Sequence, residues 1–257
     1  YCDFLSGPAG EKEKEEYVKM LVDEIRNCPD TVQNYRVISI FFGGGTPSLL
    51  TGEQIGRLMD TVREIFTLEE DAEITMEMNP GAVTEEKLRK YRQAGVNRLS
   101  IGLQSVNDEE LRLLGRIHTY EEFREAYHLA RANGFSNINV DLISAIPGQT
   151  VESWRRTLEQ VMALFPEHIS AYSLILEEGT TFYKKYVEDE AKEGPKLPDE
   201  DAERQMYWDT ETLMEKNGYH RYEISNYAKE GYACRHNLGY WERIPYLGFG
   251  IGAASLV

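Results

Sequence analysis

Short apolar runs alternate with amphipathic stretches along the first two thirds of the chain. The apolar runs have the length and composition of strands, and they cover residues 37–42, 72–78, 98–103, 138–143 and 168–174. Around them, apolar residues recur at helical spacing and predict helices at 11–25, 51–66, 84–94, 108–133 with a break at 115–118, and 153–165. Strands and helices that alternate in this way are typical of right-handed βαβ units and of a parallel, barrel-like sheet.

The pattern changes after residue 177. A polar, proline-bearing connection covers 184–203, and the helix that follows at 202–216 has a buried apolar face and ends before Gly218. A short β-region is predicted at 221–225. We therefore expect two domains, one at 1–177 and a smaller one at 178–257.

Polar residues gather where the predicted strands end. The first strand runs into a glycine-rich turn, and the later strand ends carry acids, amides or hydroxyls: Gly43, Gly44, Gly45 and Thr46, then Glu77 with Asn79, Gln104, Asp141, and Tyr172 with Ser173. In α/β barrels the active site lies at the carboxyl ends of the strands. Each signal alone has a structural explanation, because three glycines also make a tight turn and Asp141 could be a buried carboxylate held by backbone N–H groups. Polar residues at the equivalent ends of five predicted strands favour a shared cleft.

Composition narrows the classes of function. Hydrophobic residues make up 41% and charged residues 28% of the 257 residues, as in soluble globular proteins, and no apolar run is long enough to span a bilayer. The net charge of −16 disfavours nucleic acid as a partner. The three cysteines, Cys2, Cys28 and Cys234, are too scattered for a disulfide framework, and without a signal peptide we expect a reducing cytoplasm. A first residue other than Met and a Gly-rich apolar end suggest a piece of a longer protein.

A cluster near the end of the chain combines a histidine, an amide and two aromatic residues, namely His236, Asn237, Tyr240 and Trp241. An apolar plate with an imidazole at its edge suits a flat macrocycle whose iron takes a nitrogen ligand. The structural alternative is a packed aromatic corner around a satisfied histidine. Cys234 and His236 by themselves do not make a zinc site, because such a site needs further ligands.

In sequence order, these motifs resemble those of radical S-adenosylmethionine (SAM) enzymes, in the oxygen-independent coproporphyrinogen III oxidase-like family. Residues 1–4 resemble the tail of the family's Cys-x3-Cys-x2-Cys motif, and 43–48 resemble its SAM-binding turn. The remaining matches follow at 77–81, 100–105, 114–118 and 140–143. The resemblance covers essentially the whole chain.

Two places indicate a branch within that family. The oxidases that act on coproporphyrinogen carry a further cysteine where this chain has Phe4. The HemW-type heme chaperones lack it and carry His-Asn-x-x-Tyr-Trp, which residues 236–241 reproduce. The chain departs from many relatives at Ala254, where they have a histidine.

The resemblance implies three cofactors: a [4Fe–4S] cluster, SAM and heme. Cys2 would be a cluster ligand, and His236 a ligand of the heme iron. The implied SAM site consists of Gly43, Gly44, Gly45 and Thr46 at the methionyl amino end, Arg116 at its carboxylate, and Glu77, Gln104 and Asp141 at the ribose and neighbouring groups. The implied heme site consists of His236, Asn237, Tyr240 and Trp241.

The implied fold is α/β, a partial (β/α)6 radical SAM barrel of parallel strands with a smaller α+β C-terminal domain. The core at 1–177 would lack its first strand and two cluster cysteines, and the HemW-like domain at 178–257 would be incomplete. The implied function is a cytoplasmic heme chaperone that delivers heme to acceptor hemoproteins, with contact at a membrane surface. The alternatives are oxidative decarboxylation of coproporphyrinogen III, and a barrel enzyme that binds an unrelated metabolite without SAM.

Overall fold

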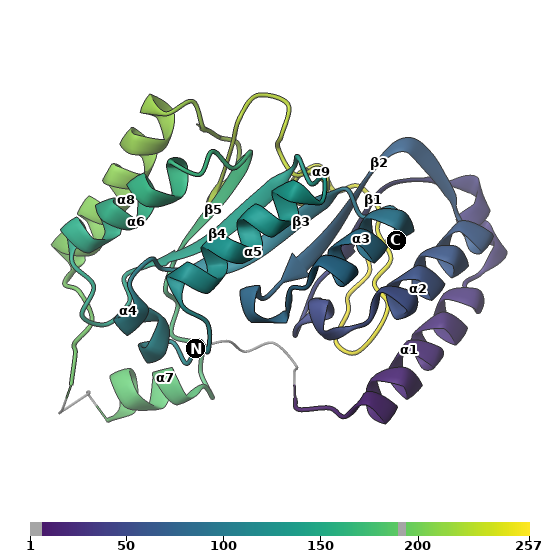
Figure 1. Cartoon of the computed structure of the whole chain (residues 1–257), viewed down its shortest axis with the longest axis horizontal. Coiled ribbons are helices and arrows are strands. Elements are labelled where there is room, and N and C mark those ends of the chain that lie inside the picture. Colours follow the sequence, from purple (N-terminus) through teal and green to yellow (C-terminus); the bar gives the residue numbers. More distant parts are fainter. Residues whose placement is uncertain (1–6, 190–193) are drawn as a thin grey trace. The chain divides into compact units, whose positions relative to one another are not determined.

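The computed structural model describes residues 7–189 and 194–257 of the chain (Figure 1). The predicted cluster ligand Cys2 and the branch marker Phe4 lie outside the described residues. The five predicted strands are present as β1 Arg36–Phe42, β2 Thr67–Met78, β3 Arg98–Gln104, β4 Ile138–Ser144 and β5 His168–Ser173. The helices around them are α1 Glu11–Arg26, α2 Gly52–Ile65, α3 Glu85–Ala94, α4 Asp108–Leu113, α5 Tyr120–Ala132 and α6 Val151–Met162. The predicted alternation, including the break between α4 and α5, is confirmed.

Within residues 7–189 and 194–257, seven strands form one sheet in the order β1-β2-β3-β4-β5-β7-β6. β1 pairs in parallel with β2, and β4 with β5. The last two strands, β6 His220–Arg221 and β7 Asn226–Ala228, are antiparallel to each other, and β7 is antiparallel to β5. The α/β fold with a parallel, barrel-like sheet is therefore confirmed, and the antiparallel pairing of β6 and β7 adds to it.

The β-region predicted at 221–225 is wrong in its position. Residues 222–225 connect β6 to β7 and are not a strand. The Glu223 side chain holds this connection, because its Oε1 accepts hydrogen bonds from the Ser225 backbone N–H at 2.8 Å and from the Asn226 amide at 2.5 Å. A side chain that bonds the backbone two residues later favours a turn over a strand.

The chain divides into two compact units. Of the described residues, the first unit, here called the outer-strand unit, contains 7–99, 129–136 and 234–257, and the second, the central unit, contains 100–128, 137–189 and 194–233. The outer-strand unit holds β1, β2 and the last helix, α9 Arg235–Trp241, and the central unit holds β4 to β7. The predicted domain boundary at residue 178 stays a prediction.

In the outer-strand unit, α2 lies between α1 and α3 (Figure 1). Its apolar side chains Ile55, Leu58 and Met59 are almost fully buried, and burial of each such side chain stabilises the fold by about 1.5–3 kcal/mol. Thr51 caps the helix, because its hydroxyl accepts the Gln54 N–H at 3.2 Å. The helical spacing that predicted this element therefore marks its buried face.

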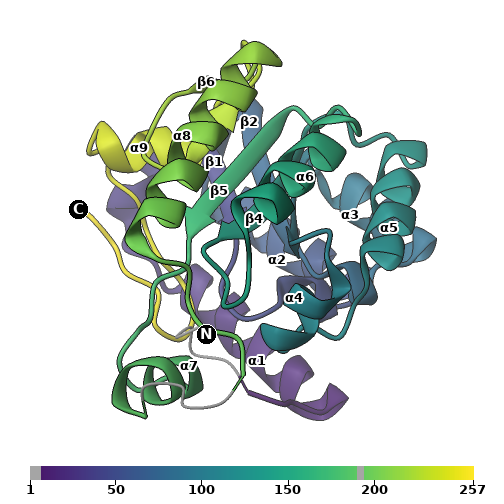
Figure 2. The same ribbon diagram turned by 90° about the vertical axis from the view of Figure 1, so that its left-hand side faces the viewer.

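In the central unit, α6 packs beside α8 Glu200–Lys216, which confirms the predicted late helix (Figure 2). Trp154 of α6 is fully buried, and its indole N–H donates to the Thr210 hydroxyl at 2.9 Å. The predicted connection at 184–203 differs at its start, because a π-helical turn over Lys184–Glu188 continues directly from α7 Thr181–Tyr183. Tyr186 is buried in this turn against Phe182, four residues before it, with ring centroids 5.3 Å apart.

Candidate functional site

The glycine turn that follows β1 is shaped by two side chains. The Glu77 carboxylate, at the end of β2, accepts the Gly44 backbone N–H at 3.1 Å. Gly44 has φ of +107°, a conformation that favours glycine. A Cβ on Gly43 would lie 2.9 Å from the Phe41 ring and 3.3 Å from the Glu77 carboxyl carbon. The three glycines are exposed, so the turn presents backbone to a ligand while Glu77 and Phe41 support it.

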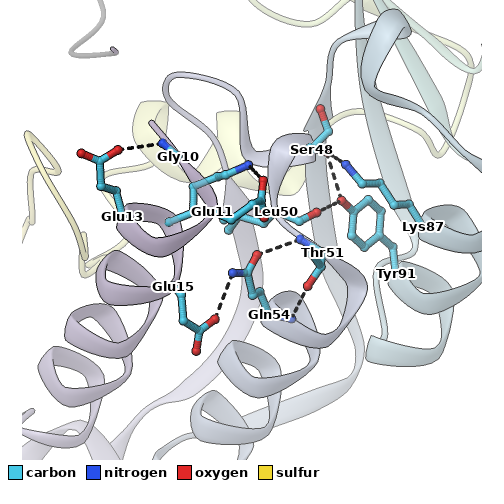
Figure 3. A network of polar contacts seen from close by, with 11 residues as sticks. Gly10, Glu11, Glu13, Glu15, Ser48, Leu50, Thr51, Gln54, Lys87 and Tyr91 are labelled. Atoms are coloured by element: carbon cyan, nitrogen blue, oxygen red, sulfur yellow. Dashed lines mark hydrogen bonds and ion pairs between the residues drawn. The ribbon is translucent and has the colours of Figure 1, made fainter. Parts of the chain in front are cut away.

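Polar contacts fix the far side of this turn (Figure 3). The Ser48 carbonyl accepts from the Lys87 ammonium at 2.7 Å and from the Tyr91 hydroxyl at 3.3 Å, and the same hydroxyl donates to the Leu50 carbonyl at 2.6 Å. Burial raises the pKa of Tyr91 well above its usual range, so its hydroxyl stays a donor. The buried Ser48 hydroxyl accepts the Asn79 N–H at 3.1 Å and links the turn to the end of β2. Lys87 and Tyr91 belong to α3, which therefore holds the segment that follows the turn.

In the central unit, the end of β3 has an unusual backbone. Gln104 has φ of +76° although it is not a glycine, and conformations of this kind gather at functional sites. Its amide and the Arg116 guanidinium both lie over Gly102, where a Cβ would come within 2.9 Å of the amide nitrogen and 3.2 Å of the guanidinium. The absence of a side chain at Gly102 thus lets two predicted site residues lie side by side.

Asp141 projects from β4 of the same unit. Its Oδ2 accepts from the Ser100 hydroxyl at 2.9 Å, and its Oδ1 accepts from the Asn139 amide at 2.8 Å. The side chain is half-buried. Both carboxylate oxygens are therefore oriented by side chains of the sheet.

The histidine cluster forms a short helix, α9, which the sequence pattern did not predict. α9 packs on β1, where the His236 ring stacks on Phe41 with ring centroids 4.6 Å apart and an interplanar angle of 21°. Tyr240, one helical turn later, meets His236 edge-on at 4.8 Å. The Phe41 ring thus stacks on the imidazole and also lies where a side chain at Gly43 would project. The predicted heme ligand and the glycine turn therefore have one aromatic neighbour in common.

A buried carboxylate anchors the start of α9. Glu73 of β2 is 7% exposed, and it accepts from the backbone N–H of Arg235 at 3.1 Å, the N–H of His236 at 3.3 Å and the Cys234 thiol at 3.2 Å. Burial raises the pKa of Cys234 to about 11, so the thiol keeps its proton and donates it. The Arg235 guanidinium adds a surface ion pair with Asp71 at 2.6 Å. Two acids of β2 therefore hold the first turn of α9.

The His236 imidazole is suited to binding a metal as a neutral ring. Burial lowers its pKa, the nearby Glu73 carboxylate opposes this shift, and the Arg98 guanidinium adds to it. Among the residues that the structure describes, neither ring nitrogen has a hydrogen-bonding partner. Two further members of the cluster are open to a ligand, because Tyr240 and Trp241 are 48% and 57% exposed, and Asn237 is half-buried.

We expect the pKa of His236 to lie below the usual histidine value of about 6.5, and Glu73→Gln to lower it further by removing the charge that favours the imidazolium. Because folding lowers this pKa, the native state loses stability relative to the unfolded chain as the pH falls below about 6.5. A titration of the ring protons by NMR measures both values. A pKa in wild type above 6.5 would contradict this description of the site.

The predicted site residues thus fall into two groups. The outer-strand unit brings Glu77 to the glycine turn and joins that turn to His236 through Phe41. The central unit places Gln104 beside Arg116 and holds Asp141 in its own network, and Cys2 lies outside the described residues. Within the described residues, no three metal-ligating side chains lie together as a metal site.

Sequence reasoning missed supporting residues that lie inside strands. Glu73 of β2 and Asn139 of β4 stand two or four positions before a predicted site residue and on the same face, because side chains alternate along a strand. The available signal is a polar residue two or four positions before a predicted site residue, on the same face of the strand.

Comparison with known proteins identifies the superfamily to which the chain belongs. A family model described as the radical SAM superfamily matches residues 1–161. The structure is similar to that of coproporphyrinogen III oxidase (HemN) from Escherichia coli, with a TM-score of 0.82 and 27% identity, over 100% of this chain and 61% of that one. The chain belongs to the radical SAM superfamily.

Two curated relatives of high similarity belong to one group within this superfamily. The heme chaperone HemW of Escherichia coli is 42% identical over 100% of this chain and 66% of its own length. That of Bacillus subtilis is 38% identical over 100% of this chain and 67% of its own length. The chain thus spans about two thirds of the length of these relatives, and its similarity is to HemW heme chaperones along the whole of it. In the described part of the chain, no helix has the length and apolarity needed to cross a membrane.

Proposed function

We propose that the complete protein is a heme chaperone that binds heme and delivers it to acceptor hemoproteins, and that it retains a [4Fe–4S] and SAM site. The observation that carries the proposal is the environment of His236, a half-buried imidazole whose ring face is held by Phe41 and whose nitrogens have no partner among the described residues. The similarity to HemW heme chaperones supports it. We place this activity in the cytoplasm, with contact at a membrane surface during delivery.

Four residues of α9 would hold the heme. His236 would provide a nitrogen to the iron, since neutral imidazole is a common axial ligand. The exposed rings of Tyr240 and Trp241 offer flat apolar surface to a macrocycle, and the Asn237 amide directly follows His236 in sequence. Ala254 has only a methyl group where many relatives have a histidine, so we expect no iron ligand from that position.

The residues present fit SAM. The exposed Gly43–Gly45 backbone and Thr46 would hold its methionyl amino end, and Arg116 would pair with its carboxylate. Glu77, Gln104 and Asp141 would hold the ribose and neighbouring groups through acceptor oxygens and an amide. With Cys2 as one ligand, a bound cluster would supply the electron for reductive cleavage of the SAM sulfonium.

Gly43→Ala is expected to weaken SAM binding about tenfold, because the new methyl group would displace the Phe41 ring or the Glu77 carboxylate from the turn. Equilibrium dialysis with labelled SAM on the reconstituted full-length protein measures the affinity. The matched control is Gly56→Ala on α2, where a Cβ meets nothing within 4 Å. Equal affinities of the two variants would exclude the turn from the SAM site.

The second candidate function is oxidative decarboxylation of coproporphyrinogen III, which the structural similarity to HemN favours. The deciding experiment is anaerobic incubation of the reconstituted full-length protein with SAM, a reductant and coproporphyrinogen III, beside a heme titration of the same preparation. We expect stoichiometric heme binding and no protoporphyrinogen. Formation of protoporphyrinogen would overturn a function limited to heme delivery. A barrel enzyme without SAM is excluded if SAM raises the melting temperature and Asp141→Ala abolishes that effect.

A further inference from the structure

A continuous line of hydrogen bonds, buried at its centre, crosses the central unit and ends at Asp141. Strand register places Asn139 of β4 beside His168 of β5, and Asp141 beside Ser170. Asn139 and His168 are at most 2% exposed. Buried polar side chains need hydrogen-bond partners, and these two side chains hydrogen-bond to each other.

The orientation of the Asn139 amide follows from its partners. Its Nδ2 lies 2.8 Å from Asp141 Oδ1 and 2.7 Å from Ser100 Oγ, and a carboxylate can only accept, so the NH₂ group faces Asp141. The amide oxygen therefore faces the other way. It accepts from His168 Nδ1 at 2.6 Å, because an amide oxygen cannot donate.

The same reasoning assigns the tautomer of a neutral His168 ring. A neutral His168 ring with its proton on Nδ1 has an acceptor at Nε2. The Tyr222 hydroxyl lies 2.8 Å from Nε2 and donates to it, with the two rings edge-on at 5.5 Å. Every donor from Tyr222 through His168 and Asn139 points toward the Asp141 carboxylate.

We propose that Asn139 and His168 are positioning residues for Asp141 in the SAM site, and that the Tyr222 hydroxyl sets the His168 tautomer they require. The inference rests on the proposed role of Asp141. The network holds both carboxylate oxygens from the sheet side before any ligand binds, so a ribose hydroxyl meets an acceptor already oriented. Preorganised groups bind more tightly because less conformational freedom is lost on binding. Tyr222 lies beyond the five parallel strands, so the segment that follows α8 contributes to the same site.

A double-mutant cycle tests the proposal on the reconstituted full-length protein, with SAM affinity measured by equilibrium dialysis. Asn139→Leu is expected to weaken SAM binding about tenfold, since it removes the amide donor to Asp141 Oδ1. In an Asp141→Ala background the same substitution is expected to have no further effect, because Asn139 acts through that carboxylate. Full additivity would overturn the proposal, as would wild-type affinity in Asn139→Leu.

Two tyrosines give a matched comparison. Tyr222→Phe removes the donor to His168 and is expected to weaken SAM binding severalfold. Tyr219→Phe removes a buried hydroxyl that donates to the Pro166 carbonyl at 2.7 Å, outside the network, and is expected to lower the melting temperature with SAM affinity unchanged. Equal effects of both on SAM affinity would mean that only stability was perturbed and would overturn the assignment.

The same variants separate this inference from the function on which it rests. Heme affinity is expected to stay at the wild-type value in Asn139→Leu and Tyr222→Phe. Wild-type SAM affinity in Asp141→Ala would remove Asp141 from the SAM site and overturn both statements. Weak SAM binding by Asp141→Ala with normal binding by Asn139→Leu would overturn the inference alone.

Discussion

Replacing His236 with alanine is expected to weaken heme binding by the full-length protein at least about tenfold, equivalent to 1.4 kcal/mol or more, and to change the heme spectrum. The imidazole is held by stacking on Phe41 and by the anchoring of the helix that carries it. It has the lowered pKa that keeps a ring nitrogen available to iron. Titration of heme into wild type and variant, followed by the Soret band, measures both effects.

The control is His220→Ala. His220 is exposed in β6 and pairs with Glu215 at 3.0 Å, so its loss removes an imidazole without touching α9. We expect wild-type heme affinity and spectrum for this variant. An unchanged spectrum in the His236→Ala variant would remove His236 as the iron ligand.

Glu73→Ala is expected to lower the free energy of unfolding by about 3 kcal/mol, and heme affinity with it. The carboxylate accepts two backbone N–H groups and one thiol from residues 234–236. Removing the carboxylate takes the acceptor of these donors from the protein interior. A buried donor or acceptor without a partner lowers the stability of the fold by about 1–3 kcal/mol. Urea denaturation measures the stability, and heme titration of the folded protein measures the positioning of His236.

Asp71→Ala provides the comparison from the same strand. Asp71 pairs with Arg235 of the same helix, but at the surface, where an ion pair contributes roughly 0–1 kcal/mol. We expect nearly wild-type stability and heme affinity. If the two substitutions had equal effects, the burial of Glu73 would not be what fixes α9.

The sequence allowed the strand order along the chain and the position of the glycine turn to be predicted, because both depend on local patterns. A continuous apolar run into three glycines identifies β1 and its end, and Glu77 at the next strand end is confirmed as a partner of the turn. Helix α2 could be predicted with its cap, since Thr51 and Gln54 lie three residues apart in sequence.

Contacts between distant segments could not be predicted in this way. Glu73 meets residues 234–236 across most of the chain, and the helical form of α9 depends on that contact more than on its own seven residues. The π-helical turn at Lys184–Glu188 forms because Tyr186 is buried against Phe182, although the surrounding composition is polar. In both places tertiary packing overrides the local pattern.

The proposed role of His236 as ligand to heme iron is tested most directly by electron–nuclear double resonance of the ferric, heme-loaded full-length protein with its histidines labelled with ¹⁵N. We expect a ¹⁵N coupling from an iron-bound imidazole in wild type and in His220→Ala, and its loss in His236→Ala. A coupling that persists in His236→Ala, or is absent from wild type, would contradict this role.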